Sequence, residues 1–153
     1  MKRFVFAMAA LLVSAGVFAQ VSTTANTQAT QAKKGEDFVK FKEMLHNFGK
    51  IKQGVPVTFD FNFDNISDKP VVIESATASC GCTTPVKPDA PIAKGKADKI
   101  TAGFNAQAAG IFTKSIYVKV AGADTPVEIK ITGEVLTADE YVKYEKDKDS
   151  KKS

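Results

Sequence analysis

A strict alternation of apolar and polar residues runs from Val57 to Asp64 and leaves this segment little choice of structure. Successive side chains of a β-strand point to opposite faces, so such a pattern makes one face apolar and the other polar. The apolar set is Val57, Phe59, Phe61 and Phe63, and the polar set is Thr58, Asp60, Asn62 and Asp64. The segment is therefore predicted to be a strand that covers a core on one side and meets water on the other.

Similar patterns continue toward the C-terminal end. Turn residues at 65–70 are followed by 71–78, which is predicted to be the returning strand. Prolines 85, 88 and 91 with Gly95 predict a long loop after it. Three more strands are indicated by inward apolar residues: Ile100, Ala102 and Phe104; then Phe112, Ile116, Val118 and Val120; then Val127, Ile129, Ile131 and Val135.

Short strands separated by turn signals are typical of a β-sandwich. We predict an all-β protein, an immunoglobulin-like antiparallel β-sandwich of about seven strands, over residues 37–136. The chain has no tryptophan and its two cysteines are neighbours, which excludes the antibody-type core. Residues 36–48 have apolar spacing that also fits a helix, but one or two short edge strands are favoured there.

The first residues carry the pattern of a signal peptide. Lys2 and Arg3 precede an uncharged, mostly apolar run from Phe4 to Phe18, and Val17–Ala19 is a suitable cleavage site. The run is 15 residues long, shorter than the roughly 18 to 20 that span a bilayer. We therefore expect residues 1–19 to be removed, no transmembrane anchor, and export to the periplasm or the extracellular space.

The polar residues 20–36 are predicted to be a flexible leader, because they offer little apolar surface to bury. At the other end, residues 137–153 form a charged tail with both signs mixed. Thr137 and Glu140 have the spacing of a capping box for a short helix with Tyr141 and Tyr144, but a frayed tail is favoured. Without Lys2 and Arg3 the chain has 19 basic and 17 acidic residues, which excludes a strongly basic nucleic-acid surface.

Cys80 and Cys82, separated by Gly81, are the candidate site. Their Cα atoms would be about 6.6 Å apart in an extended strand, near the upper limit for a disulfide, so a bond between them is feasible if Gly81 bends. As a staple it would contribute only about 1.6 kcal/mol, because the ring is short. An oxidised or free pair at a strand end, a redox couple and a soft-metal site all stay open, with His46 and Met44 as the other soft or nitrogen donors.

Seven segments together resemble the bacterial domain-of-unknown-function family 1573, which is related to immunoglobulin-like domains of the hydin type. They are Asn47–Gly54, Phe59–Asn65, Lys69–Ile73, Ser79–Thr83 (SCGCT), Pro91–Gly95, Gly110–Lys114 and Ile129–Val135. The similarity spans about residues 44–136, and SCGCT is its most specific element; Pro91–Gly95 lacks the proline that usually stands directly before the glycine. The resemblance implies an exported immunoglobulin-like module, commonly from the Bacteroidetes group, without an established activity.

The sequence offers no phosphate-binding loop and no recognisable arrangement of catalytic residues around its single histidine. We therefore expect a non-enzymatic module without a cofactor that binds another protein or a cell-envelope structure. The alternative hypothesis is a thiol-redox or soft-metal (Cu or Zn) protein that acts through Cys80 and Cys82. In either case the pair is expected at the end of the strand that starts near Val71, oxidised and accessible.

Overall fold

The computed structural model describes residues 32–150. The predicted signal peptide (1–19) and most of the predicted leader (20–36) lie outside the described residues. The last leader residues belong to the folded part, because Gly35 is buried and its N–H donates to the Thr125 carbonyl at 3.0 Å. A Cβ at Gly35 would lie 2.5 Å from Cγ2 of Val127, which explains the need for glycine here.

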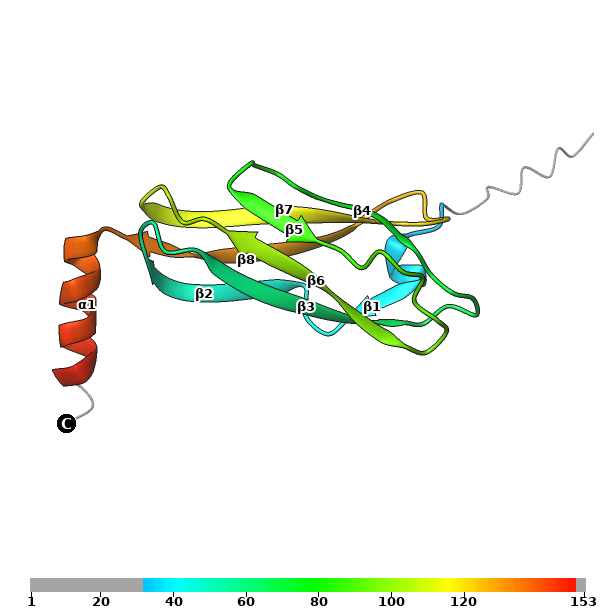
Figure 1. Ribbon diagram of the computed structural model, residues 1–153, viewed down its shortest axis with the longest axis horizontal. Coiled ribbons are helices and arrows are strands. Elements are labelled where there is room, and N and C mark those ends of the chain that lie inside the picture. The colour runs from blue at the N-terminus through cyan, green and yellow to red at the C-terminus, as the bar shows by residue number, and fades with distance from the viewer. Residues whose placement is uncertain (1–31, 151–153) are drawn as a thin grey trace, which may run out of the picture. The chain divides into compact units, whose positions relative to one another are not determined.

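Eight strands form two four-stranded sheets, which lie on one another as the two layers of a sandwich (Figure 1). The first sheet has the order β1 (Val39–Phe41), β3 (Val57–Asn65), β6 (Ala97–Phe104), β5 (Thr83–Val86). The second has the order β2 (Leu45–Lys52), β8 (Val127–Leu136), β7 (Gly110–Val120), β4 (Ile73–Ala78). A short 3-10 helix, η1 (Gly35–Asp37), precedes them and a helix, α1 (Ala138–Ser150), follows. The predicted all-β sandwich is confirmed, with eight strands instead of about seven.

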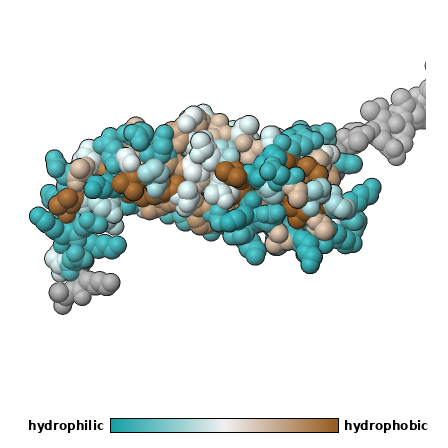
Figure 2. Space-filling view, in the orientation of Figure 1, coloured by the Kyte–Doolittle hydropathy of each residue, from teal (hydrophilic) through white to brown (hydrophobic). Residues whose placement is uncertain are grey.

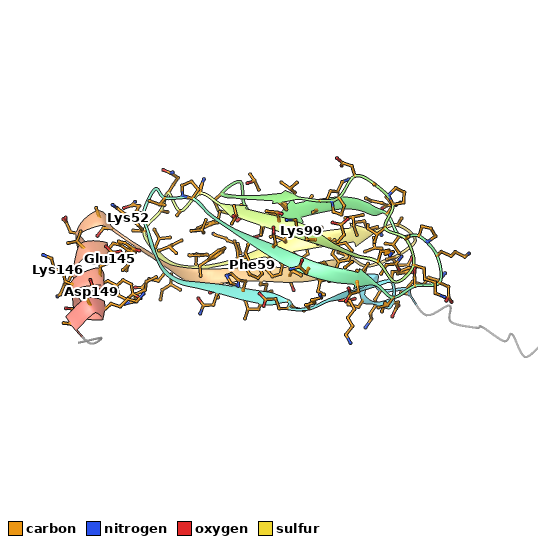
Figure 3. The ribbon with its side chains drawn as sticks, turned by 60° about the horizontal axis from the view of Figure 1, so that its bottom comes forward. Lys52, Phe59, Lys99, Glu145, Lys146 and Asp149 are labelled. Carbon is orange, nitrogen blue, oxygen red and sulfur yellow. A yellow bond between two sulfur atoms is a disulfide. The ribbon has the colours of Figure 1, made fainter. Side chains whose placement is uncertain are left out.

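The core lies between the sheets and is built from the predicted alternation. Phe61 and Phe63 of β3 are fully buried, and the inward residues of β6, β7 and β8 named above are buried as well. Phe59 is only partly buried, and its ring stacks on the His46 ring with 3.5 Å between centroids. Figure 3 shows Phe59 between the two layers.

Apart from the end of η1, residues 36–48 contribute to strands and form no further helix, which agrees with the prediction from the sequence. They supply β1 and the start of β2, which belong to different sheets. β2 pairs with β8 in parallel, the one parallel pair among otherwise antiparallel neighbours in the described sheets. The register shifts between Asn47 and Lys50, where Gly49 has a φ of 67°. Glycine adopts this left-handed conformation without strain.

Two expectations for the middle of the chain were wrong. The returning strand begins at Ile73 and not at Val71, which forms an isolated bridge with Ile92 instead. The segment Thr83–Val86, expected within a long loop, is the strand β5 and contains Pro85. β5 lies at the edge of its sheet, where a missing N–H can face away from the ladder.

The expectation of a frayed tail was also wrong, because residues 138–150 form α1. The backbone N–H and the hydroxyl of Thr137 donate to Glu140 Oε2 at 2.9 and 2.8 Å, and Glu140 N–H lies 3.5 Å from Thr137 Oγ1. The helix buries none of its residues, although Lys50 Nζ lies 5.2 Å from the centre of the Tyr144 ring. Neither described helix has the length and apolar character that crossing a membrane requires.

Candidate functional site

Cys80 and Cys82 form a disulfide in the turn between β4 and β5. Their Cα atoms are 5.4 Å apart, closer than in an extended strand, so the chain bends at Gly81 as a bond between positions i and i+2 requires. Since β4 and β5 belong to different sheets, this turn carries the chain from one layer of the sandwich to the other. The pair follows β4, as expected, but it precedes a strand instead of a loop.

Backbone hydrogen bonds hold the turn on both sides of the disulfide. Ser79 N–H donates to the Ser115 carbonyl of β7 at 2.9 Å, and Ser115 N–H donates to Ser79 Oγ at 3.2 Å. On the other side, Asn105 N–H donates to the Cys82 carbonyl at 3.1 Å. The two sulfur atoms are therefore positioned by β7 and by the end of β6, and not by the disulfide alone.

Both cysteines are half-buried, which is less accessible than the sequence suggested. Cys82 packs against the core, and the adjacent Thr83 is 3% exposed. The Thr83 hydroxyl oxygen lies 3.7 Å from Cys80 Sγ and 4.0 Å from Cys82 Sγ. A buried hydroxyl therefore faces both sulfur atoms from the protein side.

A cavity of about 290 Å³, called the disulfide cavity below, opens beside this turn. Its walls come from the disulfide turn, the end of β6, the loop after it and the start of β7. The lining residues are Gly81, Cys82, Phe104, Asn105, Gln107, Ala108, Ala109, Gly110, Ile111, Phe112 and Lys114. Phe104 and Phe112 stack with 4.2 Å between ring centroids, and Ile111 is 86% exposed. Cys82 lines the disulfide cavity and Cys80 does not.

Lys114 is the site residue that the sequence reasoning missed. It occupies an inward position of β7, between buried Phe112 and buried Ile116, and it is half-buried. Within residues 32–150 no carboxylate pairs with its amine. The signal was available in the alternation of β7, which places even-numbered residues inward and so sets one lysine among apolar side chains.

A soft-metal site finds little support in the arrangement of these groups. Sulfur atoms bonded to each other do not act as thiolate ligands. In the part of the chain that the structure describes, no three His, Cys, Asp or Glu residues gather as a metal site would need. Of the other two candidate donors, Met44 is exposed, and His46 stacks on Phe59 with its Nδ1 3.2 Å from Glu43 Oε1.

The fold and the site define an immunoglobulin-like β-sandwich with a cysteine pair at the crossing between its sheets. The particular family follows from the sequence: residues 39–135 match the model of DUF1573, a protein family of unknown function, and the chain belongs to this family. The predicted resemblance is thus confirmed. Two segments on which it rested, Ser79–Thr83 and Gly110–Lys114, meet at the disulfide cavity.

No curated protein matches the chain. Among solved structures, a protein of unknown function from Porphyromonas gingivalis W83 has 17% identity and a TM-score of 0.56, over 72% of this chain and 51% of that one. The VesB protease of Vibrio cholerae has 14% identity and a TM-score of 0.52, over 65% of this chain and 32% of that one. The ASH/PapD-like domain 7 of human CEP192 has 9% identity and a TM-score of 0.50, over 65% and 86%. At these identities the similarity shows the fold alone, and the chain spans only about half of the Porphyromonas protein.

Proposed function

We propose that this protein is an exported, non-enzymatic module that binds an extended segment of another protein at the free edge of β4. In this mode a partner strand is added to a sheet, and the partner is held by main-chain hydrogen bonds. The observation that supports the proposal is that β4, from Ser75 to Ala78, has no lysine, proline or register shift of the kind that protects sheet edges.

The four edge strands differ in how they are protected against strand addition. Proteins protect edges with short strands, proline, bulges and lysine. β1 has only three residues, β5 contains Pro85, and β2 combines a register shift with Lys50 and Lys52. β4 has six residues without lysine, proline or glycine, and its register shift lies at its first residues, between Ile73 and Ser75.

The pairing of β4 with β7 determines which backbone groups face outward. Ser79 N–H donates to Ser115 of β7, and hydrogen-bonded pairs alternate along an antiparallel ladder. Thr77 therefore pairs with β7, whereas the N–H and C=O groups of Ala76 and Ala78 point away from the sheet. Just before β4, Val71 and Ile92 exchange two backbone hydrogen bonds of 2.9 and 2.8 Å, an isolated bridge that ends before the strand begins at Ile73.

The face of the molecule shown in Figure 2 does not offer a broad apolar contact surface. On the face shown in Figure 2, apolar residues lie in small separate patches among hydrophilic ones. Specific recognition through side chains alone needs a larger contiguous patch. Main-chain pairing at an edge does not have this requirement.

The non-enzymatic character is supported by the surroundings of His46, the single histidine of the chain. Its ring stacks on Phe59, and its hydrogen-bonding partner in residues 32–150 is the carboxylate of Glu43 instead of a serine or cysteine. A nucleophile activated by histidine would need a hydrogen bond to the ring. The similarity to VesB covers a third of that protease and carries no activity to this chain.

Photo-crosslinking in the exporting bacterium tests the strand-addition proposal. A photoreactive residue at exposed Thr77 of β4 should give one discrete adduct with another polypeptide, whereas the same residue at exposed Thr58 of β3 should not. Ala76→Pro removes an outward N–H without removing a bond to β7, so it should abolish the adduct while the circular dichroism spectrum stays folded. Equal adducts from both positions, or an adduct that persists in the folded proline variant, would contradict binding at β4.

A further inference from the structure

The disulfide cavity brings together three groups that the strand-addition proposal does not use. Its lining includes Cys82, the cationic residue Lys114 and the apolar residues Phe104 and Phe112. Behind the disulfide, the buried hydroxyl of Thr83 faces both sulfur atoms. A disulfide with an accessible cavity on one side and a hydrogen-bond donor on the other has the arrangement that thiol–disulfide exchange needs.

We propose that the Cys80–Cys82 disulfide oxidises cysteine thiols of a polypeptide whose cysteine, flanked by apolar residues, enters the disulfide cavity. The incoming thiolate attacks Cys82 Sγ, and Cys80 is the leaving sulfur. The direction follows from placement, because Cys82 lines the cavity and Cys80 does not. This activity is independent of binding at β4, and either can fail without the other.

The exchange balances in two steps. The partner thiolate forms a bond to Cys82 Sγ, and the bond between the two protein sulfur atoms breaks with its electron pair leaving on Cys80. A second cysteine of the partner then attacks the partner's own sulfur in the mixed disulfide, and Cys82 leaves as a thiolate. The partner dithiol is oxidised to a disulfide, the protein disulfide is reduced to a dithiol, and the two protons pass to Cys80 and Cys82.

Thr83 and Lys114 have separate parts in this reaction. The Thr83 hydroxyl oxygen is closer to Cys80 Sγ (3.7 Å) than to Cys82 Sγ (4.0 Å), so its O–H can donate to the departing Cys80 thiolate. A hydrogen bond to a thiolate lowers its basicity and makes it a better leaving group. Lys114 lines the same cavity and carries a positive charge, and a nearby positive charge favours the thiolate form of an entering cysteine.

The size and the lining of the disulfide cavity also limit which thiol-containing molecules can reach Cys82. Its volume of about 290 Å³ admits a few side chains and not a folded domain. Its lining includes the stacked Phe104 and Phe112 and the exposed Ile111, so it favours apolar residues next to the reacting cysteine. A blocked peptide with leucine on both sides of a single cysteine is therefore a suitable probe, and glutathione, which is polar, is its comparison.

The sulfur that is attacked can be located by tandem mass spectrometry. The mature wild-type protein is mixed with the single-cysteine peptide, so that exchange stops at the mixed disulfide, and the mixture is quenched with acid. Cleavage of the backbone at Gly81 separates the two cysteines in the fragment spectrum. We expect the peptide on Cys82 about tenfold more often than on Cys80, and a second-order rate about tenfold higher than with glutathione. Equal labelling, a preference for Cys80, or equal rates with both thiols would overturn the proposal.

Substitutions separate the chemistry from the fold. Lys114→Gln removes the charge at similar size and should lower the rate about three- to tenfold. Lys130→Gln, on the outward face of β8 where the amine pairs with Glu128 and does not line the cavity, should change it less than about twofold. Thr83→Val keeps the shape of the buried side chain but removes the hydroxyl, and it should lower the rate of the exchange step in which Cys80 leaves as a thiolate by a similar factor. Rates unchanged by both substitutions in folded protein would contradict these roles, and if a variant fails to fold the wild-type labelling still decides the proposal.

Discussion

Phe61 is the residue at which the sequence alternation has its largest structural consequence. Its side chain is fully buried between the sheets and meets the Phe59 ring edge-on, with 5.0 Å between centroids. Phe61→Ala should lower the free energy of unfolding by about 3 to 5 kcal/mol, because it leaves a large cavity. Thr58→Ala, on the outward face of the same strand, should change it by less than about 0.5 kcal/mol. Urea unfolding followed by circular dichroism measures both, and similar losses would mean that β3 does not face the core as described.

Asp60, on the outward face of β3, gives one source of acid sensitivity. Hydrogen bonds from the Lys99 amine and then from the Thr101 hydroxyl lower the pKa of Asp60 below its ordinary value of 3.8. Since the folded-state pKa is the lower one, the stabilisation is present above about pH 3.8 and is lost as the pH falls through the folded-state value.

Thr101→Val should therefore raise the titration midpoint of the Asp60 carboxyl group, measured by NMR in the folded protein. The substitution should also weaken the dependence of the urea midpoint on pH in this acidic range. Thr58→Val, on the same strand but without a bond to Asp60, is the matched control. An unchanged midpoint in Thr101→Val would show that the hydroxyl does not stabilise the carboxylate.

Among the elements, α1 depends most on local interactions. None of its residues is buried, so the capping box between Thr137 and Glu140 has an unusually large share in its stability. Thr137→Ala should cost the helix about 1 kcal/mol and reduce the helical part of the far-ultraviolet circular dichroism. The melting temperature of the sandwich should not move, because the helix buries none of its own residues. A lower melting temperature of the sandwich would show that α1 supports the sheets.

The sequence predicts elements well where one physical signal dominates. The strands β3, β6, β7 and β8 follow from period-two alternation, because one face of each is buried. It misses β5, because Pro85 indicates a loop although an edge strand tolerates proline. It also misses α1, because the mixed charges of the tail favour a frayed end although the capping box at Thr137 and Glu140 is present. The parallel pairing of β2 with β8 depends on contacts between distant segments, which local patterns do not contain.

The candidate site can be predicted from the sequence only in part. Cys80 and Cys82 are the only cysteines of the chain, so the sequence alone identifies them as a candidate site. Lys114 is harder to predict, because a charged residue does not suggest an inward position, although the alternation of β7 places it on the inward face. The disulfide cavity itself was beyond sequence reasoning, since it joins segments from 81 to 114 through their folding.

For the whole molecule, the disulfide and the expected export support each other. Disulfides form and persist in oxidising compartments and are rare in the cytosol of most bacteria. The bonded pair is therefore consistent with the proposal that residues 1–19 direct the chain out of the cytoplasm and that the mature protein begins at Gln20.

Intact-mass measurement of two forms of the protein tests this connection. The full chain, expressed in a Gram-negative bacterium, should be recovered outside the cytoplasm with the mass of Gln20–Ser153 less two hydrogens, and should resist alkylation until a reductant is added. A form without residues 1–19 should stay in the cytoplasm and alkylate at both Cys80 and Cys82 without reductant, because the cytosol keeps thiols reduced. Comparison of the two forms tests separately whether residues 1–19 direct export and whether Cys80 and Cys82 are oxidised. A membrane-bound species that retains Met1 would contradict the signal peptide, whereas an exported species with two free thiols would contradict the disulfide as its resting state.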